Sequence, residues 1–357
     1  MSLPSAAPFV ATGVRIAAGI ALVLAVSAEL LAGGVAGIGV FVNLAGSGNR
    51  TDLMMAATVW AGVLGVLANV LLLAGERRLF HWHRMRTGGV GVVKLLTKIW
   101  VIPALLVVWE FAARAVGNTD FPPPTTIVAA MYELWFSGPA SRIFLTDDAI
   151  DNILPSLGRM FGGWILAALI GIIAGMLLGR SRTATDYVDP LIEFGRSLPP
   201  PLLIPVFLVL QAGLHSPYGV LITQLATIVF GVVWPVLLNS IDGARAIDRT
   251  YTETATVFNL TRFQRLRVVV LPAASPKIFA GLRLSLSLAL ILMVLTELIG
   301  GSDGIGYQLL QAQRSFDGAA VWATITLLGI LGYVVNSLFV LAERRVLVWH
   351  RQATRNP

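Results

Sequence analysis

The sequence has no cysteine, and only 13% of its 357 residues are charged. The missing cysteines exclude disulfide bonds, thiolate zinc sites and cysteine nucleophiles. No candidate metal ligands surround its four histidines, which are His81, His83, His215 and His350. Soluble domains usually carry about 25% charged residues, whereas this chain is 56% hydrophobic and has a mean hydropathy of +0.79. This composition predicts a protein that lies in a lipid bilayer.

Long apolar runs divide the chain. Seven of them are about 20 residues long, enough to cross roughly 30 Å of hydrocarbon as helices, and they begin near residues 14, 53, 99, 157, 219, 279 and 319. An eighth, residues 200–213, follows an amphipathic stretch and contains Pro200, Pro201 and Pro205. Proline-broken backbone at membrane depth is tolerated where protein or a water-filled cavity satisfies its polar groups. We predict an all-α membrane protein of about eight helices whose broken segment lines a pathway; an interfacial kink is the alternative.

The basic residues form four clusters beside these runs. They are Arg77, Arg78, Arg84, Arg86, Lys94 and Lys98; Arg180 and Arg182; Arg245, Arg249, Arg262, Arg265, Arg267 and Lys277; and Arg344, Arg345, Arg351 and Arg355. Eight crossings place all four clusters and both termini on one face, which the positive-inside rule makes cytoplasmic. Topology therefore explains the net charge of +7 better than a nucleic-acid partner does. The acidic residues between 120 and 151 are expected in an external loop.

An internal repeat joins the two ends of the chain. Residues 14–84 align with residues 282–351 at a shift of about 267 residues with one single-residue adjustment. The matches include Glu29 with Glu297, Gly37-Ile38-Gly39 with Gly304-Ile305-Gly306, Asn69 with Asn336, and Trp82-His83 with Trp349-His350. We predict that residues 1–88 are a duplicated transmembrane hairpin and residues 89–357 a complete domain. Because the counterpart of residues 14–28 is an internal helix, they are not expected to be a signal peptide.

Residues 240–278 form a charged stretch between two apolar runs. Glu253 is expected in the first turn of a helix begun by Thr250 or Thr252, where a carboxylate favours the helix dipole. The spacing resembles the EAA loop of ABC importer permeases, which docks on a cytoplasmic ATPase. The resemblance implies ATPase coupling through Glu253, Thr254, Ala255, Asn259, Leu271 and Pro272.

Two positions depart from the EAA pattern. Thr254 replaces an alanine, and Asn259 replaces a glycine. Asparagine tolerates a left-handed backbone better than other residues with a Cβ, so the turn that ends the docking helix remains possible. An ordinary amphipathic cytoplasmic helix is the alternative.

Residues 89–357 resemble, over their whole length, the permeases of aliphatic sulfonate, taurine and nitrate importers. The matching features are Phe121-Pro122-Pro123-Pro124, Arg159, Arg196-Ser197-Leu198-Pro199-Pro200, Leu203-Ile204-Pro205, and Thr296-Glu297-Leu298-Ile299. Gln211-Ala212-Gly213 departs from the usual Trp-Phe-Gly. The resemblance implies a type I ABC importer permease fold with two extra N-terminal helices before a six-helix core.

The same resemblance implies the partners. They are a cytoplasmic ABC ATPase dimer that carries ATP and Mg, an extracytoplasmic solute-binding protein, and a second permease chain in the bacterial inner membrane. The chain itself is expected to bind no cofactor or metal and to catalyse no reaction. Residues 1–88 match only the last part of such a core, so they are not expected to engage an ATPase.

Intramembrane polar residues are candidates for a gate, because an unpaired charge in the bilayer is costly. Glu297 is expected near the outer end of its helix and Arg159 at the start of another, where the two would pair or each would reach headgroup water. Glu29 repeats Glu297 without a copied arginine and is expected to snorkel outward. The candidates for the pathway and gate are Arg159, Arg196, Pro200, Pro205, Gln211 and Glu297.

The predicted function is the translocation subunit of an ATP-driven importer. It would move a small solute, such as a sulfonate, taurine or nitrate, by alternating access. A secondary active transporter is one alternative, although it would need two balanced halves and a midplane ion site. A membrane scaffold subunit with a degenerate coupling loop is the other. No carboxylate pair, Ser-His-Asp set or metal cluster favours an enzyme.

Overall fold

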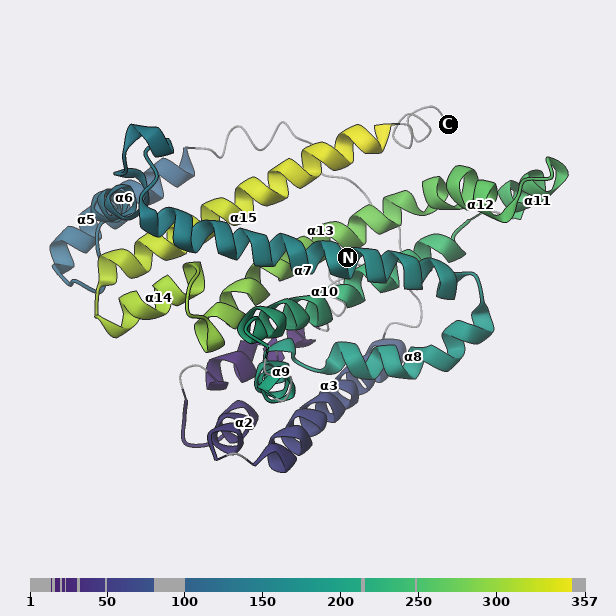
Figure 1. Cartoon of the computed structure of the whole chain (residues 1–357), viewed down its shortest axis with the longest axis horizontal. Helices are drawn as coiled ribbons and strands as arrows, with labels where there is room; N and C mark the ends of the chain where they lie inside the picture. Colours follow the sequence, from purple (N-terminus) through teal and green to yellow (C-terminus); the bar gives the residue numbers. More distant parts are fainter. Residues whose placement is uncertain are drawn as a thin grey trace. The chain divides into compact units, whose positions relative to one another are not determined.

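All regular secondary structure in the part that the computed structural model describes is helical (Figure 1). The described residues are 14, 17–19, 21, 22, 24–30, 33–48, 50–79, 100–212, 216–247 and 249–348. No strand occurs among them, so the all-α prediction is confirmed. The described residues do not include the four histidines, Arg15, Gly213, or the Trp82-His83 and Trp349-His350 ends of the repeat.

The chain divides into two compact units. Unit 1 comprises residues 1–21, 67–156 and 301–330, and unit 2 comprises residues 22–66, 157–300 and 331–357. Each unit is therefore assembled from separate segments of the sequence. The predicted boundary between residues 88 and 89 remains a prediction.

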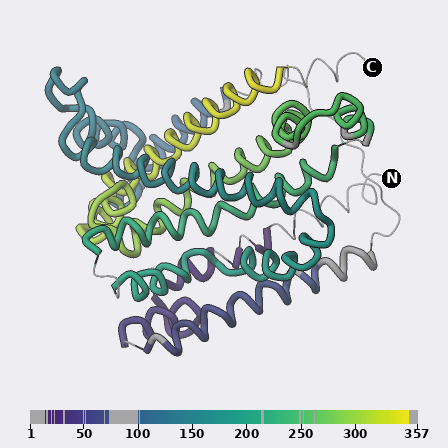
Figure 2. Tube along the Cα trace, turned by 45° about the vertical axis from the view of Figure 1, so that its right-hand side comes forward, coloured from purple at the N-terminus to yellow at the C-terminus, as the bar shows by residue number. Residues whose placement is uncertain are grey.

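Unit 2 is built around α7 (Asp147–Gly179), α10 (Gly219–Arg245) and α13 (Leu271–Gly300). Glycines on α7 let α10 approach closely: a Cβ on Gly171 would lie 2.9 Å from Val236, and one on Gly175 would lie 2.5 Å from Ser240. The third glycine of this row, Gly179, meets Ala244 in the same way. Small residues four positions apart are a common means of packing membrane helices. The α10 and α13 helices also lie side by side (Figure 2).

A sharp bend separates α8 (Arg182–Ser197) from the helical segment Pro200–Ala212, which consists of the short turn η3 (Pro200–Leu202) and α9 (Leu203–Ala212). The two parts differ in direction by 81°. Proline cannot continue the helical hydrogen bonding here, so the break occurs where the sequence predicted it.

Five helices among the described residues are long and apolar enough to cross a membrane, or six if the bent pair counts as one span. They are Asp52–Leu72, Ala140–Gly179, Gly219–Arg245, Phe263–Gly300 and Gly318–Val346. Two of the eight predicted spans form shorter helices: the apolar helix Ala17–Leu30, and α5 (Val101–Val116), which has 16 residues.

The α7 helix begins at Asp147, ten residues before the predicted start of its span. The Ala149 N–H donates to Thr146 Oγ1 at 3.1 Å, and Asp147 and Asp148 occupy the first turn, where carboxylates favour the helix dipole. Part of the acidic segment expected in a loop is thus helical. The apolar run indicated the membrane portion of the helix and missed its polar beginning.

The ends of the chain repeat in structure as well as in sequence. The α2 helix (Ile38–Ser47) and α14 (Ile305–Arg314) each have 10 residues, and α3 (Thr51–Leu79) and α15 (Gly318–Val346) each have 29. In each pair, the second helix begins and ends 267 residues after the first, as Ile38 and Ile305 illustrate. The repeat found in the sequence therefore extends to the bounds of the helices.

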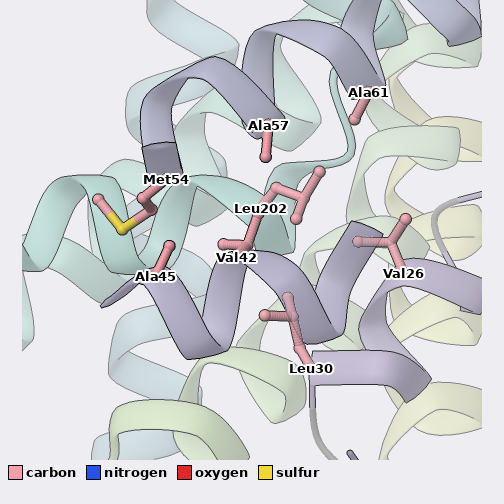
Figure 3. Packing of buried hydrophobic residues seen from close by; sticks show 8 residues of the cluster. All are labelled: Val26, Leu30, Val42, Ala45, Met54, Ala57, Ala61 and Leu202. Atoms are coloured by element: carbon pink, nitrogen blue, oxygen red, sulfur yellow. The ribbon is translucent and has the colours of Figure 1, made fainter. Parts of the chain in front are cut away.

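The N-terminal elements of unit 2 form a core around the bent segment. Leu202 of η3 is fully buried and packs with side chains from α2, α3 and the helix before α2 (Figure 3). The cluster consists of Val26, Leu30, Val42, Ala45, Met54, Ala57, Ala61 and Leu202. Gly62 and Gly65 of α3 lie against Leu198 and Ser197. The N-terminal segment therefore covers one side of the break between α8 and α9.

Unit 1 contains α5, α6 (Pro124–Met131), the π-helical turn η1 (Tyr132–Phe136), the short turn η2 (Ala140–Arg142), α14 and the beginnings of α7 and α15. Trp109, Phe121 and Trp322 form an aromatic cluster. The Gly304 N–H donates to Asn152 Oδ1 at 2.9 Å, which fixes the start of α14 against α7. Residues 301–304 thus form the turn that precedes α14.

Candidate functional site

A buried ion pair joins α7 to α13 in unit 2. The Arg159 guanidinium donates from Nη1 to Glu297 Oε1 at 2.7 Å, with 9% and 0% of the two side chains exposed. Glu297 lies three residues before the end of α13, as expected, but Arg159 lies twelve residues inside α7 rather than at its start. Burying such a pair costs desolvation that only close geometry and further hydrogen bonds offset. The two residues therefore pair, and their role in a gate stays a prediction.

Glu29, the counterpart of Glu297 in the repeat, does not snorkel outward. Its Oε2 accepts the backbone N–H of Gly39 at 2.8 Å, at the start of α2. The first N–H groups of a helix have no partner within the helix and attract carboxylates. The expectation was wrong because it considered only ionic partners.

A row of buried polar residues on α10 was not predicted. Thr223, Gln224 and Thr227 are each at most 2% exposed. Thr227 donates to the carbonyl oxygen of Thr223 at 2.8 Å, whereas neither amide atom of Gln224 has a hydrogen-bond partner among the described protein atoms. A buried amide without partners is costly and is available to a bound solute or water. The signal was an amide inside an apolar run, and Gln224 was not among the candidates chosen from the sequence.

The bent segment places its predicted residues in different surroundings. Arg196 is exposed and pairs with Glu193 at 2.9 Å, and Pro200 packs against Gly231 of α10. Pro205 is half-buried. Gln211 donates from Nε2 to the carbonyl oxygen of Ser216 at 3.3 Å and so holds the connection to α10. These contacts do not bring the six candidates into one cluster; only Arg159 and Glu297 meet.

The predicted coupling segment folds as two short helices, α11 (Arg249–Val257) and α12 (Arg262–Arg265). Asn259 has a φ of 51°, the Leu260 N–H donates to the carbonyl oxygen of Ala255 at 3.0 Å, and the Asn259 N–H donates to that of Thr256 at 3.0 Å. This pattern is a Schellman motif. The left-handed turn predicted at Asn259 is therefore present.

The second of these helices begins with a capping box. The Thr261 N–H donates to Gln264 Oε1 at 2.9 Å, and the Gln264 N–H donates to Thr261 Oγ1 at 3.3 Å. This reciprocal pair satisfies two N–H groups that the helix cannot. The turn between α11 and α12 is thus fixed on both sides.

The surface of this turn differs from the predicted one. Glu253, Thr254 and Asn259 are exposed, but α11 begins at Arg249, so Glu253 lies in the second turn and not the first. Ala255 is 2% exposed, and its methyl group therefore packs within the chain instead of presenting a contact surface.

Three large apolar side chains are also exposed at this turn, beside the polar ones. Val257, Phe258 and Phe263 are 78%, 72% and 70% exposed. We call these three residues the apolar tip. An exposed apolar patch on a polar segment is typical of a protein interface, and sequence motifs alone did not identify it.

The α11–α12 segment continues directly into the long helix α13 (Leu271–Gly300). A π-helical turn, η4 (Leu266–Val270), follows α12, and Leu271 and Pro272 are the first residues of α13. Phe263–Gly300 forms one helical run of 38 residues. The apolar tip is therefore connected by continuous helix to the end of α13 that carries Glu297.

Comparison with known proteins places these features in a family. Residues 167–348 match the family described as binding-protein-dependent transport system inner membrane component. The chain is 31% identical to an aliphatic sulfonates transport permease of Bacillus subtilis over 252 residues, 70% of this chain and 86% of that protein. It is 28% identical to a nitrate import permease of Synechocystis over 255 residues, 71% and 90% of the two chains. A bicarbonate transport permease of Synechococcus elongatus is 28% identical over 249 residues, which are 69% of this chain and 87% of that protein.

Proposed function

The chain belongs to the binding-protein-dependent permeases of ABC importers, and we propose that it is the translocation subunit of an importer for a small anion. The relatives are named for sulfonates, nitrate and bicarbonate, which are all small anions. Several apolar helices fit a multi-pass protein of the inner membrane. We also propose that the chain works by alternating access, in which the solute passes from an external binding protein to the cytoplasm.

The observation that carries this proposal is the apolar tip between α11 and α12. Val257, Phe258 and Phe263 would be unfavourable in water, and a hydrophobic groove on a partner would bury them. We propose that this partner is the ATPase of the importer, a separate subunit that binds ATP and Mg. The α11–α12 turn and both termini would then be cytoplasmic.

Continuous helix offers a route from that contact to the pathway. A run of 38 residues is about 57 Å long at 1.5 Å per residue, so movement of the tip would be carried along α13. Glu297 and its partner Arg159 lie near the far end of this run. We propose that ATP binding moves α13 and alters this pair, while a second permease chain completes the pathway.

Substitution of the apolar tip tests the proposal. We expect Phe258→Ser to abolish co-purification of the ATPase and ATP-driven uptake of nitrate, bicarbonate or an alkanesulfonate, with normal membrane insertion. Phe316→Ser is the matched control, because Phe316 is 87% exposed but lies after α14. Normal ATPase binding and uptake in the Phe258→Ser variant would contradict the docking assignment.

A further inference from the structure

Four arginines converge on one hollow of unit 2. The hollow has a volume of about 700 Å³ and lies where α7 ends, α8 begins and α10 ends, beside α12. Arg180, Arg182, Arg245 and Arg265 line it, together with one carboxylate, Asp186. We call it the basic hollow. Two of the basic clusters found in the sequence meet there.

The arginines have no ionic partners among the described residues. None lies within 4.0 Å of a carboxylate oxygen described in the structure. Arg180, Arg182 and Arg245 are exposed, whereas Arg265 is half-buried and its Nε has neither solvent contact nor a hydrogen-bond acceptor. Like charges held close together repel one another, and a buried donor without an acceptor is unfavourable. An anion in the hollow would relieve both costs.

The position of the hollow indicates what the anion is. The apolar spans of α7 and α10 end at Gly179 and Arg245, so the hollow lies at the depth where phospholipid headgroups begin. Leu177 and Ile173 of α7 are 68% and 61% exposed. They lie four residues apart on one face of α7, and Arg180 directly follows the end of that helix. An apolar strip thus leads to the basic site, as a lipid with an anionic headgroup requires.

We propose that the basic hollow binds the phosphate of an anionic phospholipid, whose acyl chains lie along Ile173 and Leu177. Planar guanidinium groups match phosphate oxygens in geometry and charge, and basic pockets between membrane helices are suited to such headgroups. Because Arg265 belongs to α12, the bound lipid would anchor the α11–α12 turn to the membrane surface. The inference does not depend on the transported solute.

Lipid titration of the purified full-length chain tests the proposal. Native mass spectrometry would compare phosphatidylglycerol with phosphatidylcholine of identical acyl chains, and inorganic phosphate would serve as a competitor. The double variant Arg180→Gln, Arg245→Gln removes two charges from the hollow. The control variant Arg142→Gln, Arg314→Gln removes two exposed arginines of unit 1.

We expect phosphatidylglycerol affinity to fall roughly tenfold to thirtyfold in the hollow variant, since each basic residue contributes about a fivefold factor. It should change less than about threefold in the control, and phosphatidylcholine binding should change in neither. Asp186→Asn should strengthen phosphatidylglycerol binding, a gain that misfolding cannot produce. Equal phosphatidylglycerol affinity in the two double variants would overturn the proposal. So would complete displacement of the lipid by millimolar phosphate, which would assign the hollow to a free anion.

Discussion

At the scale of single residues, the polar side chains inside the apolar helices are the informative ones. Glu29 and Glu297 occupy equivalent positions in the repeat, yet one accepts a backbone N–H and the other pairs with Arg159. Sequence identified both residues because charge in an apolar run is rare. It could not assign their partners, because these depend on which helices meet in space.

The ion pair between Arg159 and Glu297 should be strongly coupled. We expect Arg159→Met to destabilise the protein by about 3–5 kcal/mol, because it leaves a buried carboxylate without its counter-charge. Adding Glu297→Met should recover most of that loss. Thermal unfolding in detergent would measure both, and Arg50→Met in the exposed pair with Asp52 is the control, which should shift the unfolding temperature far less because solvent screens exposed pairs. A double variant no more stable than the single one would show that the pair is not coupled.

Substitution of Gln224 distinguishes a structural role of its side chain from a functional one. Gln224→Met keeps the size of the side chain but removes an amide that has no protein partner, so thermal stability should stay the same or rise. If the amide contacts the solute, the apparent affinity for transport should fall about twofold to tenfold, the value of one hydrogen bond. Unchanged uptake kinetics in a fully stable variant would remove Gln224 from the pathway.

At the scale of elements, glycine spacing determines how closely helices approach. Gly175 and Gly158 lie on the same helix, α7, but a Cβ would meet Ser240 at 2.5 Å at the first position and nothing within 4 Å at the second. Gly175→Ala should therefore lower thermal stability by separating α7 from α10. Gly158→Ala should raise it by up to about 1 kcal/mol through helix propensity. Equal effects of the two substitutions on the unfolding temperature would contradict this account of the packing.

The coupling segment shows what local sequence can predict. The resemblance to the EAA loop located a left-handed turn at Asn259, and asparagine is a residue type that permits it; the structure has this turn, with a φ of 51° at Asn259. The capping box of Thr261 and Gln264 was also readable from its spacing. The burial of Ala255 was not, because it results from packing against the rest of the chain.

At the scale of the whole molecule, the N-terminal segment stabilises the bent segment. Leu202 is fully buried in a cluster otherwise made of N-terminal side chains. The sequence predicted the repeat but not this contact, because similarity to residues 282–351 gives no information about where the N-terminal copy packs.

Deletion of residues 1–88 should expose Leu202 and lower the yield of assembled complex more than the turnover of each assembled complex. The full-length variant Leu202→Ala is the matched comparison, and it should lose about 2–5 kcal/mol of stability through the cavity it leaves. Quantitative blotting of the complex and uptake per complex would distinguish assembly from turnover. A truncated complex that assembles fully but cannot transport would give the N-terminal segment a direct mechanical role.

ATP binding on a partner subunit is proposed to drive movement in this chain. The most direct measurement uses single cysteines placed one at a time at residues 196–205 in the intact complex, because the chain has no native cysteine. Labelling by a polar thiol reagent would be followed with and without ATP and Mg. The account predicts that labelling changes when ATP binds and that Phe258→Ser abolishes the change. Identical labelling in both conditions, in a complex that contains and uses its ATPase, would contradict alternating access and favour a static scaffold.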